Sequence, residues 1–198
     1  MNPTEMDCVK TIAVFDFDGT LAAHDSLWPF LVAVAGFPRC VLAVLGAAAA
    51  YLVAKDGDHR TIVKEKLLFT ILRGRRAVDL KTAIKRMKEW PCWLDSLDAL
   101  KKHHEQGHHI LIASGSLDLY IEEMLAGIPH DGVLCTRMEV VDGVLTGRME
   151  SGNCVRQRKA ELVRAYMQQN GPFGESWAYG NAPHDLPMME LMTHCVII

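Results

Sequence analysis

The chain has 198 residues, of which 49% are hydrophobic and 23% are charged, and its formal net charge is −3. This composition excludes a disordered, collagen-like or low-complexity protein, and the length allows one domain of ordinary size or one domain with an insertion. The six cysteines are too widely spaced for a zinc-binding pair, and the N-terminal residues are polar where a secretory signal is apolar. We therefore expect reduced thiols and a cytoplasmic protein.

The first predicted element is a buried strand over Thr11–Phe17, where β-branched and aromatic residues predominate. The strand runs into a turn with the sequence Asp-Gly-Thr, which begins at Asp18. The sequence therefore predicts that Asp16 and Asp18 lie where the chain leaves this strand.

The next segment, 25–92, is basic, with twelve Lys or Arg against six Asp or Glu, whereas the rest of the chain has nine against eighteen. Its first part, 27–54, is apolar and contains one charged residue, Arg39. A membrane-spanning helix needs about 20 consecutive apolar residues. Gly36 and Pro38 interrupt the run before that length is reached, so we expect two buried or surface-lying helices joined by a turn.

Further along the chain, apolar spacing and breaker residues predict alternating strands and helices. Helices are expected over Thr61–Leu72, Val78–Trp90, Leu94–Gln106, Leu117–Leu125, Arg156–Gln169 and Asp185–Met192. Strands are expected over His109–Ala113, Gly132–Cys135, Trp177–Tyr179 and Cys195–Ile198, with a hairpin around Asp142-Gly143. This alternation predicts an α/β fold with a mostly parallel sheet covered on both faces.

Polar residues follow three of the predicted strands, in the segments 16–20, 114–116 and 180–185. Ligands of such folds bind at the carboxyl ends of the strands, so these segments are candidates for the chemistry. Lys159, near the start of a predicted helix, lies between the second and third of them in the sequence.

Asp16 and Asp18 are separated by one residue, so both carboxylates can point to the same side. One carboxylate can attack phosphorus while the other donates a proton to the leaving oxygen and later activates water. Two close carboxylates need a cation, and an oxygen-rich site suits Mg2+. Ser114 and the Gly115 amide can bind phosphoryl oxygens, and Lys159 can neutralise charge on Asp16 and on the transferred group.

The segments DFDGT, SGS, Lys159 and GNAPHDLPMM occur in the order of the four motifs of the haloacid dehalogenase (HAD) superfamily. Over nearly its whole length the chain resembles the phosphoserine-phosphatase-like branch of that superfamily. The resemblance implies a Rossmann-like parallel sheet core over 1–24 and 93–198, with an inserted all-helical cap over 25–92. It also implies a Mg2+-dependent phosphatase that works through an aspartyl-phosphate intermediate.

The same resemblance implies roles for individual residues. Asp16 is expected to be the nucleophile, Asp18 the general acid and base, and Ser114 and Lys159 the phosphate binders. The expected metal ligands are Asp16, Asp18, Asn181 and Asp185, and the expected substrate-binding positions are Gly19, Thr20, Asp25 and Gly115.

One position departs from the superfamily pattern, because Asn181 stands where an aspartate metal ligand is usual. Asparagine keeps a carbonyl oxygen but removes a negative charge, so Mg2+ affinity is expected to fall unless Asp185 compensates. The alternative is a decayed site in which Asp185 only caps the following helix. Asp25 also has two interpretations, a substrate-facing carboxylate or a helix N-cap.

The apolar and basic cap suits an anionic lipid phosphate such as phosphatidylglycerophosphate, or contact with an anionic membrane surface. In this respect the chain resembles bacterial phosphatidylglycerophosphatases of the C type. Two alternatives remain: a phosphatase of a small soluble metabolite such as phosphoserine, and an inactive module that binds phosphate and metal. Overall acidity disfavours nucleic acid as a partner, and the oligomeric state is not indicated.

Overall fold

A computed structural model of the chain describes residues 9–53, 59–87, 90 and 92–198. Its main sheet has five parallel strands in the order β3-β2-β1-β6-β7. The strands are β1 (Lys10–Phe15), β2 (His109–Leu117), β3 (Gly132–Thr136), β6 (Phe173–Gly180) and β7 (His194–Ile197). The predicted parallel α/β architecture is confirmed.

Strand β1 lies at the centre of the sheet, where Val14 pairs with Leu111 of β2 and with Ala178 of β6. Its residues from Ile12 to Phe15 are fully buried, because helices cover both faces of the sheet. This explains why the strand is a nearly continuous apolar run instead of an alternating one.

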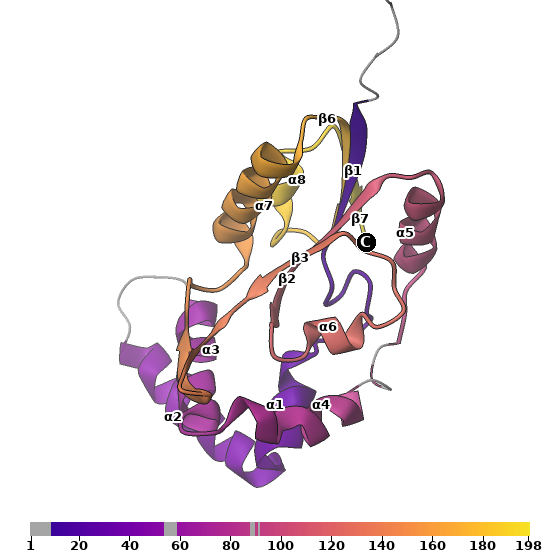
Figure 1. Cartoon of the computed structure of the whole chain (residues 1–198). Coiled ribbons are helices and arrows are strands. Elements are labelled where there is room, and N and C mark those ends of the chain that lie inside the picture. Colours follow the sequence, from indigo (N-terminus) through magenta and orange to yellow (C-terminus); the bar gives the residue numbers. More distant parts are fainter. Residues whose placement is uncertain (1–8, 54–58, 88–89, 91) are drawn as a thin grey trace, which may run out of the picture.

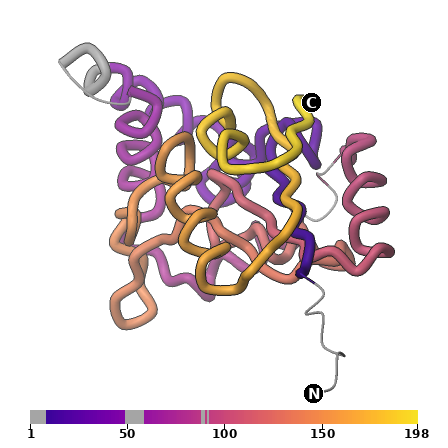
Figure 2. The backbone as a smooth tube through the Cα atoms, turned by 90° about the horizontal axis from the view of Figure 1, so that it is seen from above, coloured from indigo at the N-terminus to yellow at the C-terminus, as the bar shows by residue number. Residues whose placement is uncertain are grey.

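Helices α5 and α6 cover one face of the sheet, and α7 and α8 cover the other (Figure 1). Figure 2 shows the same separation from above, with α5 in pink and α7 in orange on opposite sides of the indigo strand β1. The bounds are α5 Ser96–Glu105, α6 Ile121–Met124, α7 Arg156–Asn170 and α8 Leu186–Met189.

The helices of the segment 25–92 gather beyond the carboxyl ends of the strands, at the bottom of Figure 1. They are α1 (Leu27–Ala35), α2 (Phe37–Val53), α3 (His59–Leu72), the 3-10 helix η1 (Ala77–Leu80) and α4 (Lys81–Met87). The described residues of this segment contain no named strand, in agreement with the predicted helical cap. We keep 25–92 as the proposed range of the cap.

The apolar run is divided into two helices, as predicted, because the chain turns at Gly36 between α1 and α2. The backbone of Gly36 has φ +81°, which favours glycine. No single helix in the described part of the chain has the length and apolar character to cross a membrane. Helices α1 and α2 have that length and character only when taken together, and the chain bends by 119° between them.

Three predicted helices are wrong in part, and the one expected over Asp185–Met192 is helical only over Leu186–Met189. The prediction placed a helix at Leu117–Leu125, but strand β2 continues to Leu117, which pairs with Thr136 of β3, so only Ile121–Met124 is helical. The pairing with β3 outweighs the local helical pattern. The helix predicted over Val78–Trp90 is divided into η1 and α4, and residues 88, 89 and 91 lie outside the described residues.

The predicted hairpin is present as β4 (Met138–Val141) and β5 (Val144–Met149), and it contacts the cap. Backbone hydrogen bonds join Gly74 N–H to the Leu145 carbonyl at 2.9 Å and Leu145 N–H to the Arg75 carbonyl at 2.8 Å. A Cβ at Gly147 would lie 2.8 Å from the Phe69 Cα, so glycine permits β5 to approach α3 closely. The cap is thus attached to the core through this hairpin as well as through its own connections.

Candidate active site

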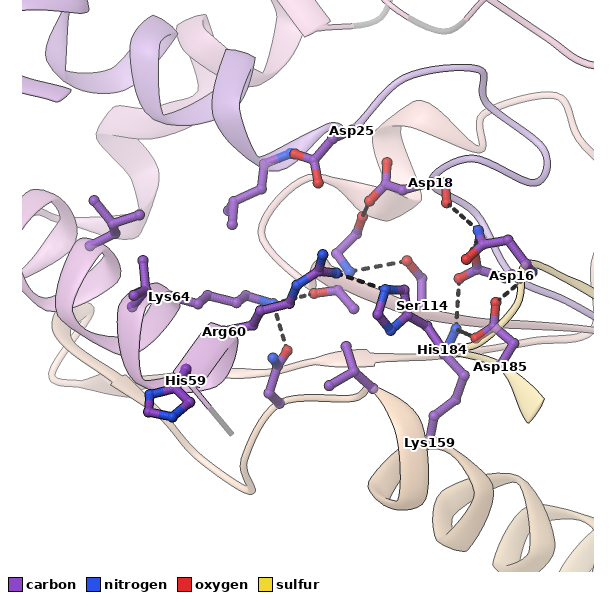
Figure 3. A pocket seen from close by; sticks show the side chains of 18 residues that line it. Asp16, Asp18, Asp25, His59, Arg60, Lys64, Ser114, Lys159, His184 and Asp185 are labelled. Atoms are coloured by element: carbon purple, nitrogen blue, oxygen red, sulfur yellow. Dashed lines mark hydrogen bonds and ion pairs between the residues drawn. The ribbon is translucent and has the colours of Figure 1, made fainter. Parts of the chain in front are cut away.

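A cavity of about 460 Å3 lies between the carboxyl ends of the sheet strands and helix α3 of the cap (Figure 3). Predicted residues from all four motifs line it together with Asp25 from the segment 25–92. They are Asp16, Asp18, Asp25, Ser114, Gly115, Lys159, Asn181 and Asp185. Parallel strands end at the same edge of a sheet, and this brings together segments that are far apart in the sequence.

A buried ion triad forms the floor of this cavity. The ammonium of Lys159 on α7 lies 2.7 Å from Asp16 Oδ1 and 2.6 Å from Asp185 Oδ1. Burial by itself would lower the pKa of Lys159, but the two carboxylates outweigh it and raise that pKa. Burial also raises the pKa of Asp16, an effect that the Lys159 ammonium opposes. The lysine therefore stays charged and holds both carboxylates in place.

The second carboxylate oxygen of Asp16 is held from the other side. Thr20 Oγ1 donates a hydrogen bond to Asp16 Oδ2 at 3.1 Å, and Asn181 Nδ2 lies 3.5 Å from the same oxygen. Thr20 is completely buried and lies outside the cavity lining, so its hydroxyl supports Asp16, and its binding of substrate stays a prediction. Gly19 also lies outside the lining; it has φ +79°, and a Cβ there would lie 3.1 Å from Asn181 Nδ2.

Asp18 is oriented by hydroxyl groups from two other segments. Ser116 Oγ donates to Asp18 Oδ2 at 2.6 Å, Ser26 Oγ donates to the same oxygen at 3.0 Å, and Ser26 N–H donates to Oδ1 at 2.9 Å. Burial raises the pKa of Asp18 to about 6, although these hydroxyl donors act in the opposite direction. A carboxyl group with this pKa can donate and accept a proton near neutral pH.

Ser114 and Gly115 belong to strand β2, where Ser114 is buried and lines the cavity. The hydroxyl of Ser114 accepts a hydrogen bond from Ser116 N–H at 3.0 Å. Because strand β2 continues through Ser114, this residue does not cap a helix.

Asp25 and Asp185 were both candidates for helix capping, and only Asp25 caps a helix. Asp25 Oδ1 accepts hydrogen bonds from the backbone of Leu27 at 3.0 Å and Trp28 at 3.2 Å, so it caps α1 while also lining the cavity. Asp185 precedes α8 but makes no side-chain capping bond. It binds Lys159 and accepts the Asn181 N–H at 2.9 Å, so it does more than cap a helix.

Several cavity residues were not predicted as site residues. Lys64 and Arg60 of α3 extend toward the core, where Lys64 binds the Gly115 carbonyl and Arg60 contacts His184 at 2.7 Å (Figure 3). The charge of the cap shows that basic residues are present but not which of them face the core. Ser116 was not predicted as a site residue, although it belongs to the same polar segment as Ser114 and could have been found from it.

Comparison with protein families matches residues 13–190 to the haloacid dehalogenase-like hydrolases. The chain belongs to this family. The match spans all the cavity segments and confirms the family suggested by the motifs. The HAD core and its helical cap are thus the framework of the cavity.

Some of the proteins similar to this chain are named as phosphatases, and others have names that state no activity. Protein CicA of Caulobacter vibrioides is 26% identical over 193 residues, which cover 94% of this chain and 85% of that protein. Phosphoserine phosphatase SerB2 of Mycobacterium tuberculosis is 26% identical over 181 residues, covering 91% of this chain and 42% of that protein. These findings confirm the prediction of a HAD-family enzyme with phosphatases among its relatives.

A solved structure of a protein of unknown function from Bordetella pertussis Tohama I has the same fold. Its TM-score is 0.80 at 21% identity, and the alignment covers 96% of this chain and 90% of that chain. At this identity the likeness establishes the fold alone, and the substrate has to be argued from the cavity.

The donors beside Asp16 fit a hard cation. Asn181 donates through Nδ2 to the Asp18 carbonyl oxygen at 3.3 Å and to Asp16 Oδ2 at 3.5 Å. A half-turn of the Asn181 amide would present its Oδ1 to the same place, beside these two oxygens. The Asp18 side chain is bound by serines instead, and Asp185 is bound by Lys159. No three His, Cys, Asp or Glu side chains are grouped as a metal site within the described residues. A carboxylate, a carbonyl and an amide oxygen form the donor set that suits Mg2+.

Replacing Asn181 by Asp is expected to tighten Mg2+ binding about tenfold or more, because a carboxylate replaces a neutral amide beside Asp16. Without Mg2+ the same variant is expected to melt at a lower temperature than the wild type, since two carboxylates then lie close together. Calorimetric titration with Mg2+ and melting curves with and without Mg2+ test both effects. Unchanged or weaker Mg2+ affinity would show that Asn181 is outside the coordination shell.

Proposed function

We propose that the protein is a Mg2+-dependent phosphatase that hydrolyses phosphate monoesters through a phosphoryl group transferred to Asp16. The observation that carries this proposal is the pairing of two aspartates with different environments on one cavity. Asp16 is ion-paired to Lys159, and Asp18 is bound by two serine hydroxyls and has a pKa of about 6. Two such carboxylates can divide the roles of nucleophile and proton donor.

In the first step a carboxylate oxygen of Asp16 attacks the phosphorus, and the bond between phosphorus and the ester oxygen breaks. The leaving oxygen takes the proton of Asp18. Lys159 and Ser114, which both line the cavity, are placed to stabilise the charge on the phosphoryl oxygens.

In the second step the ionised Asp18 takes a proton from a water molecule, whose oxygen attacks the phosphorus. The bond between phosphorus and Asp16 breaks, inorganic phosphate leaves, and both aspartates return to their initial states. Asp16, the Asp18 carbonyl and Asn181 would hold Mg2+, which supplies a positive charge that offsets the negative charges of the phosphate and the carboxylate.

For the substrate we propose an anionic lipid phosphate such as phosphatidylglycerophosphate. The cap wall of the cavity combines the cations Arg60 and Lys64 with the apolar residues Leu27, Val63 and Leu67. Outside the cavity, α2 exposes large apolar side chains: Phe37 is 61% exposed, Leu42 68% and Leu45 63%. Such a surface, on a segment with an excess of basic residues, supports contact with an anionic lipid interface.

The test is Mg2+-dependent phosphate release from phosphatidylglycerophosphate in detergent, from phosphoserine and from an aryl phosphate. We expect at least about a tenfold higher kcat/KM for the lipid, equivalent to about 1.4 kcal/mol of transition-state binding. A preference for phosphoserine, which the name of the relative SerB2 makes the second candidate, would overturn the lipid assignment and leave the reaction unchanged.

Absence of release from all three substrates, with phosphate and Mg2+ still bound, would instead identify an inactive binding module. The Asp16→Asn variant serves as the blank for contaminating phosphatases.

A further inference from the structure

Lys64 contacts the core in a way that the proposed reaction does not yet explain. Its Nζ lies 2.5 Å from the Gly115 carbonyl oxygen, 2.7 Å from Asn153 Oδ1 and 3.4 Å from Thr136 Oγ1. These three acceptors belong to different core segments, whereas Lys64 belongs to α3 of the cap. All three are neutral oxygens, unlike the carboxylates that bind Lys159.

The acceptors of Lys64 are also bound to one another and back to the cap. Thr136 Oγ1 lies 2.9 Å from the Gly115 carbonyl and 3.1 Å from Asn153 Oδ1, and Asn153 Nδ2 donates to Thr61 Oγ1 of α3 at 3.0 Å. The segment between Thr136 and Asn153 contains the hairpin that contacts the other end of α3. The core segment 136–153 thus contacts α3 at two places, through Asn153 and through Gly147, and these contacts fix α3 over the cavity.

The Gly115 carbonyl is part of a peptide group that matters for the site. A peptide group is planar and trans, so the Gly115 carbonyl and the Ser116 N–H point in opposite directions. The carbonyl is held by Lys64, and the N–H donates to the Ser114 hydroxyl at 3.0 Å. The Ser116 side chain binds Asp18 at 2.6 Å. The orientation of this one peptide therefore affects Ser114 and Asp18 together.

We propose that Lys64 is a positioning residue that ties the cap to the Gly115–Ser116 peptide and so orients Ser114 for the phosphate and Ser116 for Asp18. The proposal rests on the proposed phosphatase function. It makes phosphate binding dependent on the position of α3, because the peptide loses a donor when the cap moves away from the core. It also depends on the ammonium form of Lys64, since a neutral amine is a weaker donor.

The ionisation of Lys64 provides a measurable signature. Burial lowers the pKa of Lys64 to about 8, although Asp18 and Asp25 favour its ammonium form. Phosphate binding is therefore expected to weaken as the pH rises through about 8. Other ionisable or charged groups face it from the neighbouring segments: His59, Arg60, Asp18, Asp25, Cys135, Cys154 and His184. The thiols have pKa values of about 12 and about 11, and Asp18 of about 6, so these three groups do not titrate near 8.

The test measures binding of inorganic phosphate, in the presence of Mg2+, to the full chain by calorimetry between pH 6.5 and 9.5. We expect Lys64→Met to weaken binding at pH 7 by at least about tenfold. Lys64→Arg is expected to keep binding and to lose the weakening near pH 8, because a guanidinium stays charged. Lys66→Met, an exposed lysine on the same helix, is the matched control and should resemble the wild type.

Phosphate binding by Lys64→Met equal to that of Lys66→Met would overturn the proposal, and so would an unchanged pH dependence in Lys64→Arg. A wild-type chain that binds no phosphate would overturn it as well. If the wild type binds phosphate and the variants behave as expected, but no ester is hydrolysed, the proposed function fails while the role of Lys64 stands. Melting curves of each variant separate loss of binding from loss of fold.

Discussion

Replacing Asp16 by Asn is expected to lower kcat by at least about a thousandfold, because the amide of Asn is a poor nucleophile. The change keeps the shape of a buried side chain and the oxygen that can accept the Thr20 hydrogen bond. One of the two carboxylates on Lys159 remains, as Asp185. The loss should therefore appear in turnover and much less in folding.

The measurement is phosphate release under single-turnover conditions, with a melting curve of the same preparation. Asp98→Asn, which makes the same chemical change on an exposed carboxylate of α5, is the control and should keep wild-type activity. Residual activity of Asp16→Asn above about a tenth of the wild-type value would remove Asp16 as the nucleophile. A mass increase of one phosphoryl group, trapped on the wild type and absent from the variant, would support the covalent step directly.

Replacing Lys159 by Met is expected to remove both activity and much of the stability. The ammonium is bound at 2.7 and 2.6 Å by two buried carboxylates, which would lose their shared cation. Removal of one partner from a buried ion pair typically costs about 3–5 kcal/mol in the free energy of unfolding. Turnover is expected to fall at least about a hundredfold, because the cation beside the transferred phosphoryl group is also lost.

The pH dependence of Lys159→Met gives a second readout. Burial raises the pKa of Asp16, and without Lys159 the main opposition to that rise is lost, while the Phe17 backbone hydrogen bond remains. A carboxyl group whose pKa is higher in the folded state binds more protons folded than unfolded, so the stability deficit should shrink as the pH falls from 7 toward 5. Urea unfolding at both pH values measures this. The exposed Lys101→Met serves as control, and a deficit that is equal at the two pH values would contradict the expectation.

Much of the fold and of the cavity floor was accessible from the sequence. The polar segments containing Asp16, Ser114 and Asn181 each follow or end a buried apolar strand, and parallel strands bring such segments to one edge. Lys159 was predicted from its place between the second and third segments. Its partners lie 143 and 26 residues away along the chain, so only the motif order pointed to them.

The local patterns were less reliable where a strand or a side chain has a distant partner. Leu117 was predicted to begin a helix, but pairing with Thr136 keeps it in β2. Thr20 is a predicted substrate-binding position, and the direction of its hydroxyl, toward Asp16 in the interior, was not predicted. In both cases the deciding contact comes from tertiary packing, which a window of neighbouring residues does not contain.

The sequence alone determined the family, the parallel core, the split of the apolar run at Gly36 and the chemistry available to Asp16, Asp18 and Lys159. These follow from residue type, spacing and the order of motifs, all of which can be read along the chain. Only the tertiary structure decided that Lys64, among many basic residues of the cap, meets the Gly115 carbonyl, 51 residues away in the chain. Which face of a helix meets the core depends on how the whole cap packs, and this packing is set by contacts between segments.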